Sequence, residues 1–331
     1  MTVSLIGGPY FDQLTVGTVY DSAPAVTLTD GLAAVHQSIL GNRLRLPLDT
    51  HLSKSVTGEQ TALAHPGLVC DVAIGQSTLA THHVIANLFY RGLRFHRFPH
   101  IGETLHTRTE VVALRENSNK TGRALSGLAA LHVTSTDRRG EVILDFYRCA
   151  LLPLSDNPNP GRVRHSDDMS SIGPRDDRPW SIPQGWDLDA YRKETGSRTF
   201  VAPTPGMIHR SSGDVVSNAP ELARLSMNIA AVHHDQREQG SRLVYGGHTI
   251  GLALGQANRA FPDMIGILGW VSCDHTGPVR EGDTLTSDVT VESVDERANG
   301  IVVQLRSVVR AQRADGSDSN VLDWRFVAVM P

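Results

Sequence analysis

The chain has 331 residues, more than one domain usually contains, so two folded domains are expected. Its 31 Lys and Arg residues against 35 Asp and Glu residues give a formal charge of −4, which argues against a general nucleic-acid binder. Three separated cysteines without a CxxC spacing indicate a reducing compartment, and the start of the chain does not resemble a signal peptide. Because no apolar run is long enough to span a membrane, a cytoplasmic protein is expected.

The first half of the chain predicts helices followed by antiparallel strands. A short strand is expected within residues 11–20, and a helix over 28–40 that is capped near Thr29 or Asp30. A second, small-residue helix is expected to begin at Gly67 and to continue to about residue 88. Alternating segments at 93–98, 104–114, 124–135 and 142–152, separated by turn residues, are typical of antiparallel hairpins.

A change of composition then divides the chain. From residue 155 the sequence is rich in Asp, Asn, Pro, Arg and Ser, which predicts an irregular linker over 155–185. We therefore expect an N-terminal domain over 1–154 and a C-terminal domain over 186–331, the latter opening with a short helix at 186–195.

The second half repeats landmarks of the first half. Each pair has the same order and nearly the same spacing of about 180 residues: Gly102 and Gly282 in Gly-Glu/Asp-Thr-Leu turns, Gly67 and Gly247 before apolar helices, and Asp145 and Asp323 in the last strands. Three matches in one order predict an internal duplication. A helix packed on an antiparallel sheet is the economical arrangement for each copy, which makes the fold class α+β.

The stretch from residue 224 to 255 carries the clearest chemical signal. Asn228 and His233 are five residues apart, so a bend between them can bring an amide and an imidazole together. Tyr245, Gly246, Gly247 and His248 then lead into an apolar helix. The start of a helix offers unpaired N–H groups and a positive dipole end, and glycine allows a ligand oxygen to approach the backbone. This combination suits proton transfer beside a polarised carbonyl group.

Taken together, these motifs resemble the MaoC-like branch of the hotdog fold, which includes the (R)-specific enoyl-CoA hydratases. The whole chain is similar to the fused double hotdog members, such as mesaconyl-CoA hydratases. The resemblance implies two helix-wrapped antiparallel sheets that form a pseudo-dimer, an acyl-CoA thioester as the ligand, and no cofactor beyond the CoA of the substrate. The protein would be a monomer or a homodimer.

The family motif, Asp-x-Asn-Pro-(Leu/Ile/Val)-His, maps unequally onto the two copies. In the second copy His233 takes the imidazole position, but Asn228 stands where the family has a carboxylate. In the first copy Asp49 takes the acid position, but Lys54 stands where the family has histidine. The resemblance therefore implies one working site in the second copy and a vestigial site at Asp49 and Gly67.

The favoured hypothesis is a hydratase or dehydratase that acts on enoyl-CoA or 3-hydroxyacyl-CoA. His233 would be the general base, Asn228 would orient the water, and the Gly247 N–H would bind the thioester oxygen. Tyr245, Gly246 and His248 would contact the substrate. The alternatives are structural roles for Asn228 in a turn and Gly247 in helix packing, a non-catalytic acyl-CoA-binding or assembly module, and a thioesterase. No histidine spacing indicates a metal site.

Overall fold

The computed structural model describes residues 7–119, 122, 124–174, 178–196, 200–238 and 240–331. Parts of three sequence predictions lie outside these ranges: residues 1–6 of the N-terminal stretch, 120–121 of a predicted turn and 175–177 of the predicted linker.

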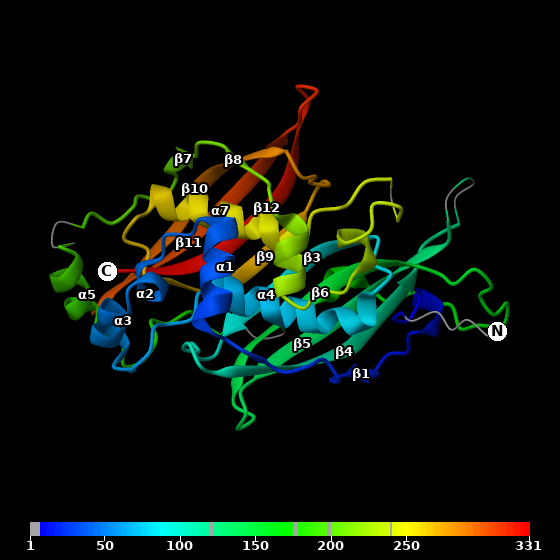
Figure 1. Ribbon diagram of the computed structural model, residues 1–331, viewed down its shortest axis with the longest axis horizontal. Helices are drawn as coiled ribbons and strands as arrows, with labels where there is room; N and C mark the ends of the chain where they lie inside the picture. The colour runs from blue at the N-terminus through cyan, green and yellow to red at the C-terminus, as the bar shows by residue number, and fades with distance from the viewer. Residues whose placement is uncertain (1–6, 120–121, 123, 175–177, 197–199, 239) are drawn as a thin grey trace.

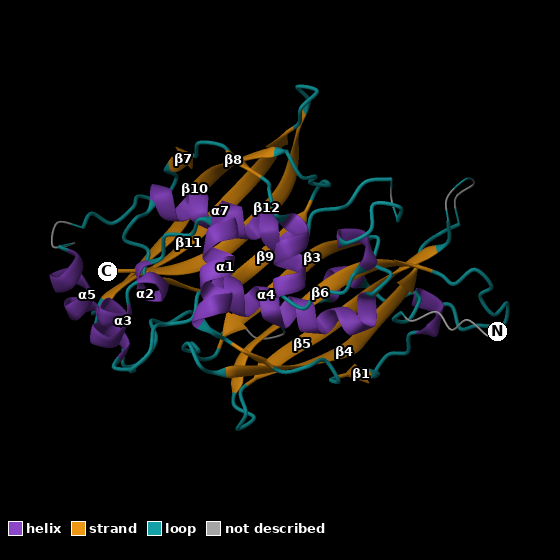
Figure 2. Cartoon of the chain, viewed as in Figure 1, coloured by secondary structure: helices purple, strands orange, loops and turns teal. Residues whose placement is uncertain are grey.

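One antiparallel sheet runs through both halves of the molecule (Figures 1 and 2). Its first half contains β3 (Ala86–Phe95), β4 (Thr104–Glu116), β5 (Ser126–Thr136) and β6 (Val142–Pro153). Its second half contains β9 (Gly266–His275), β10 (Thr284–Arg297), β11 (Gly300–Gln312) and β12 (Asp318–Met330). The strand order β4-β5-β6-β3-β9-β12-β11-β10 is the same in each half when read outward from the centre, as a duplication requires. Four short strands pair at the outer edges: β1 (Val19–Tyr20), β2 (Val26–Thr27), β7 (Ile208–Arg210) and β8 (Asp214–Val215).

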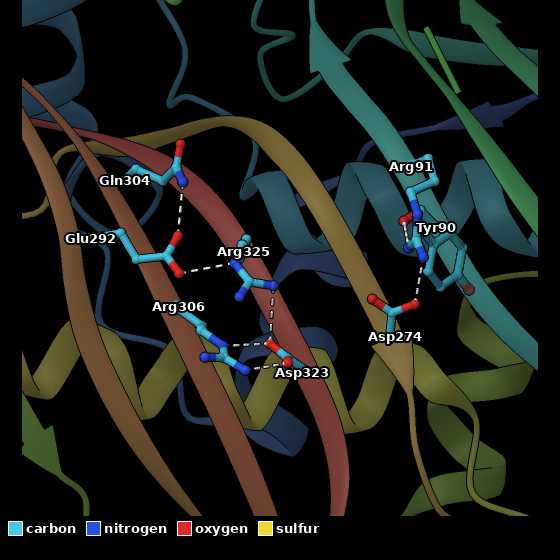
Figure 3. A network of polar contacts seen from close by, with 8 residues as sticks. All are labelled: Tyr90, Arg91, Asp274, Glu292, Gln304, Arg306, Asp323 and Arg325. Atoms are coloured by element: carbon cyan, nitrogen blue, oxygen red, sulfur yellow. Dashed lines mark hydrogen bonds and ion pairs between the residues drawn. The ribbon is translucent and has the colours of Figure 1, made fainter. Parts of the chain in front are cut away.

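The seam between the two halves is the pairing of β3 with β9. Tyr90 lies opposite Cys273 in this ladder, and Arg91 donates to Asp274 across it at 2.6 Å. Figure 3 shows this ion pair and a second polar group on β10–β12, in which Arg306 binds Asp323 and Arg325 binds Glu292. Because the seam has both ladder hydrogen bonds and a cross-strand ion pair, the two halves form one continuous sheet.

The two longest buried helices lie on the same face of this sheet (Figure 2). These are α4 (Pro66–Gln76) and α7 (Gly246–Ala260), which contact each other near the seam. All residues of α4 except Gly67 are buried, so this helix has no solvent-facing stripe. Helix α1 (Asp30–Leu40) packs across α7, where the Leu40 side chain occupies the space beside Gly251. The remaining helical segments are α2 (Arg45–Leu48), α3 (Thr50–Thr57), α5 (Leu188–Thr195), α6 (Ala219–Leu225) and the 3-10 turns η1 (Phe11–Gln13), η2 (Ser77–Thr81), η3 (Met169–Ser171) and η5 (Ala231–His233).

Most predicted elements are confirmed. Thr29 caps α1 by accepting from the Leu32 N–H at 3.2 Å, and Gly67 and Gly247 each lie in the first turn of a helix. The fold class is also confirmed, because the buried helices α4 and α7 pack on one face of a long antiparallel sheet. In the segment over 11–20, only β1 is a strand, and it follows the 3-10 turn η1.

The predicted extent of the helix after Gly67 was wrong. It ends at Gln76 and continues as the 3-10 turn η2, and β3 begins at Ala86 rather than near residue 93. The Ser77 and Thr78 hydroxyls donate to the carbonyls of Ile74 and Gly75, local bonds that compete with a longer helix.

The predicted linker is irregular in its described parts but is not detached from the fold. Met169 is buried against Ala113 and Cys149 of the first half, and Ser166 forms a bridge with Arg115. The main hydrophobic core contains residues of both halves, so the two halves share this core. The division into domains at 155–185 stays a prediction.

Candidate functional site

A cavity of about 280 Å³ lies between the two halves, beside the N-terminal end of α7. This volume is at the small end of the range typical of ligand pockets. The first half lines it with Ile74, Thr78, Thr81, residues 84–88, Tyr90 and Arg148. The second half lines it with Asn228, Ala230, residues 232–233, 243–246, Thr249 and residues 275–279. Neither half alone therefore encloses the cavity.

The loop that carries Asn228 and His233 is fixed to the first half. Gly75 of α4 packs so closely on this loop that a Cβ atom there would lie 1.6 Å from the Ser226 carbonyl oxygen. The Ile229 N–H donates to Thr78 Oγ1 at 3.0 Å, and the Ala231 N–H donates to the His82 carbonyl at 3.0 Å. These contacts set the position of the loop by backbone bonds rather than by side-chain packing alone.

His233 is held in one tautomer. Its Nδ1 lies 2.8 Å from the Leu243 carbonyl, and since a carbonyl oxygen can only accept, Nδ1 carries the proton. In the neutral ring Nε2 is then free to accept a proton. Burial lowers the pKa of His233 to about 4, and the nearby Arg148 charge acts in the same direction. His233 is therefore a neutral imidazole at physiological pH.

Asn228 lines the same cavity, so the predicted amide and imidazole do come together. Its side chain is buried, and its Oδ1 accepts from the Ala230 N–H at 2.9 Å, which closes a local turn. His234 Nε2 donates to the Asn228 carbonyl at 2.7 Å from the other side of the loop. With Oδ1 engaged in the turn, the Asn228 side chain has N–H donors left for a ligand or water oxygen.

At the start of α7, the structure separates residues that the sequence placed in one group. Tyr245 and Gly246 line the cavity, and Tyr245, the N-cap residue, makes no side-chain capping bond. Gly247 borders a smaller neighbouring cavity, where a Cβ atom would lie 2.1 Å from Asp71 Oδ1. His248 is fully buried outside the main cavity, and its ring nitrogens have no hydrogen-bond partner among the described residues. Close packing thus accounts for the glycine at 247.

The corresponding region of the first half is closed. The Gly67 N–H donates to His65 Nδ1 at 3.1 Å, so a side chain already occupies this helix start. Asp49 is exposed and caps α3 by accepting from the Leu52 N–H at 3.0 Å. Lys54 is also exposed and donates to Gln60 at 2.8 Å. Asp49 thus has the role of a helix cap.

Sequence reasoning missed Arg148, a buried arginine that lines the cavity from β6. Its neighbours at the alternate positions Leu144, Phe146, Ala150 and Leu152 are all buried. An arginine among the inward-facing apolar residues of a strand could therefore have been recognised from the sequence. His275 also lines the cavity, while the adjacent Asp274 binds Arg91.

Among the described residues, no group of three or more His, Cys, Asp or Glu side chains could hold a metal ion. Within the same ranges, no helix has both the length and the apolar character of a membrane span.

The chain is 56% identical to a conserved hypothetical protein from Mycobacterium tuberculosis that has a double hotdog fold and is essential for bacterial survival during infection. The match covers 98% of this chain and 99% of that chain, with a TM-score of 0.92. A MaoC domain protein dehydratase from Chloroflexus aurantiacus has the same fold, with a TM-score of 0.83 at 24% identity over 100% of this chain and 99% of that chain. This chain belongs to the MaoC-like double hotdog family of hydratases and dehydratases.

Two curated relatives are more distant in sequence. The chain is 26% identical to the beta-methylmalyl-CoA dehydratase of Chloroflexus aurantiacus over 98% of this chain and 97% of the relative. It is 24% identical to the mesaconyl-CoA hydratase of Cereibacter sphaeroides over 90% of this chain and 88% of the relative. No protein-family model matches the chain.

Proposed function

We propose that this protein is a hydro-lyase that adds water to an enoyl-CoA thioester or removes water from a 3-hydroxyacyl-CoA. The observation that carries this proposal is the neutral, oriented imidazole of His233 in a cavity beside an uncapped helix start. Two relatives that match most of the chain are named as a dehydratase and a hydratase of CoA thioesters. No cofactor is needed beyond the CoA of the substrate.

In the hydration direction, His233 Nε2 takes a proton from water as the water oxygen bonds to C3 of the enoyl group. The electron pair of the C2–C3 double bond moves toward the thioester and forms an enolate. The N–H group of Gly246, which lines the cavity at the start of α7, stabilises the enolate oxygen, in place of the predicted donor Gly247, which borders the neighbouring cavity. The proton on His233 is then delivered to C2, and the atoms of one water molecule have been added.

Asn228 would position the water in this scheme. Its Oδ1 accepts from the Ala230 N–H, so the side-chain N–H₂ is the part that can donate to the water oxygen. An amide cannot replace the base, which leaves proton transfer to His233. The proposal therefore assigns binding and orientation to Asn228 and proton transfer to His233.

The test is turnover of a panel of enoyl-CoA and 3-hydroxyacyl-CoA thioesters by wild type and His233→Ala. Removing a general base typically lowers the rate by about 10²- to 10⁴-fold, and we expect that loss with unchanged folding. Lys54→Ala is the matched control, because Lys54 takes the same motif position in the first half but is exposed. Equal effects of the two substitutions, or no turnover of any thioester by wild type, would contradict the proposal.

The engaged Asn228 side chain favours one alternative, an acyl-CoA-binding or assembly module. Acyl-CoA binding without turnover, unchanged in His233→Ala, would select that alternative. A thioesterase would instead release free CoA, which a thiol reagent detects in the same assay.

A further inference from the structure

We propose that Arg148 binds an anionic group, such as a carboxylate, on the acyl portion of the thioester substrate, and so selects acidic acyl groups. This inference rests on the proposed function, since it concerns the same cavity. The guanidinium of Arg148 is a buried positive charge that has no role in the proposed hydration chemistry.

Arg148 is only 4% exposed, yet it lines the cavity from the centre of the sheet. Its Nη2 donates to the Thr81 hydroxyl, the guanidinium also interacts with the Tyr90 hydroxyl, and its Nε has no hydrogen-bond partner among the described residues. Among the described residues, the groups that act on the Arg148 charge are tyrosines and a cysteine, and none is a carboxylate. The phenol rings of Tyr90 and Tyr245, which line the cavity with it, carry no charge at neutral pH.

A buried guanidinium without an anion is costly. Burial lowers the pKa of Arg148, but arginine stays protonated in proteins. Buried charges are normally paired or bound to a ligand. A guanidinium is suited to a carboxylate, because it combines a fixed positive charge with several N–H donors in one plane. A charge of this kind, lining a cavity, indicates a ligand anion.

The location of Arg148 identifies which part of the substrate would carry that anion. Arg148 and His233 line one cavity of about 280 Å³, and the Arg148 charge contributes to the lowered pKa of His233. His233 acts on the carbons next to the thioester, whereas the CoA phosphates are separated from the thioester by the long pantetheine arm. An anion that reaches Arg148 while C3 is beside His233 must therefore belong to the acyl group.

The test is a binding comparison that needs no turnover. Succinyl-CoA and butyryl-CoA have the same number of acyl carbons, differ by one carboxylate and cannot be hydrated. Calorimetry on wild type should give at least about tenfold tighter binding of succinyl-CoA, and Arg148→Met should abolish that preference while butyryl-CoA still binds. Arg310→Met is the control, because Arg310 is exposed on β11, and it should change neither affinity.

Three results would overturn the inference: no preference in wild type, a preference that survives in Arg148→Met, or an equal loss of both affinities in that variant. An equal loss would mean that Arg148 binds a part common to both thioesters. If Arg148→Met does not fold, Arg148→Lys decides, because it keeps the charge and loses the N–H donors in one plane. Its preference for succinyl-CoA should be reduced, and an unchanged preference would overturn the inference. Failure of hydratase activity alone would refute the proposed function and leave this binding result intact.

Discussion

Gly75→Ala should loosen the candidate site from a position that never contacts the substrate. A Cβ atom at residue 75 would lie 1.6 Å from the Ser226 carbonyl oxygen and 3.0 Å from the Asn228 backbone nitrogen. Ordinary contacts are near 3.5 Å, so the loop from 226 to 228 must move by well over an ångström. Overpacking of this kind costs about 1–3 kcal/mol, which exceeds the helix-propensity gain of about 0.5–1 kcal/mol for replacing Gly by Ala.

We therefore expect Gly75→Ala to lower the free energy of unfolding by about 2 kcal/mol in urea denaturation. Because the displaced loop carries Asn228, turnover should also fall, by as much as about 100-fold for a displacement near 1 Å. Gly255→Ala is the matched control: this glycine is also within a buried helix, but its Cβ would meet only the Leu40 carbonyl oxygen, at 3.4 Å. A Gly75→Ala protein as stable and active as Gly255→Ala would refute the reasoning.

Two further predictions concern titration and the replaced carboxylate. Burial lowers the pKa values of His233, His248 and His275 to about 4, below the ordinary value of 6.5. Between pH 4 and pH 6.5 the unfolded chain therefore binds more protons than the folded protein does. The stability that the neutral histidines allow is fully present above pH 6.5 and is lost as the pH falls toward 4. Each of these histidines should lower the free energy of unfolding by about 1 kcal/mol between pH 7 and 5.5, measured by urea denaturation, and His248→Phe should reduce the total loss by about 1 kcal/mol; an unchanged loss would contradict this. Asn228→Asp keeps the oxygen that closes the turn but adds a negative charge to the cavity that Arg148 lines. Steady-state kinetics should therefore show weaker turnover of acidic acyl-CoAs than of neutral ones. A gain of turnover on acidic substrates would contradict the role assigned to Arg148.

The repeated turns were sufficient to predict the sheet. Gly102 and Gly282 have φ of 100° and 90°, backbone conformations that favour glycine, and each lies in the turn just before a long strand. The alternation of apolar and polar residues after them determines which side chains face the helices. Because these signals are local, they are readable before any long-range contact is known.

The end of α4 was not predictable on the same basis. Residues 77–88 are rich in small and apolar side chains, which suits a helix, but η2 and the start of β3 depend on pairing with distant strands. Phe89 lies opposite both Cys149 and Asp274 in the sheet, so its conformation is set by both halves. Tertiary pairing overrides local propensity in such a segment.

The shared position of Asn228 and His233 at one cavity was predictable because the two residues lie in one loop. Asn228 and His233 share a segment, whereas Arg148 on β6 and Tyr90 on β3 reach the same cavity only through the pairing of distant strands. Residues 245–248 were expected to act together at the substrate, but successive residues at the start of a helix point in different directions. This geometry places Tyr245 and Gly246 at the cavity and His248 away from it.

The start of α4 in the first half is closed by a side chain, whereas the start of α7 in the second half is not. This difference helps to explain how one candidate site can depend on both halves. His65 accepts from the Gly67 N–H, so this helix end has its own cap, whereas Tyr245 leaves the start of α7 without a side-chain cap. A side-chain cap stabilises the start of a helix. A helix start without such a cap keeps N–H groups that can donate to a ligand oxygen. The first half keeps its helix and strands and uses them to hold the loop of Asn228 and His233 through Gly75 and Thr78. The first half is thus part of the candidate site, because without it the cavity would have neither its wall nor its buried arginine.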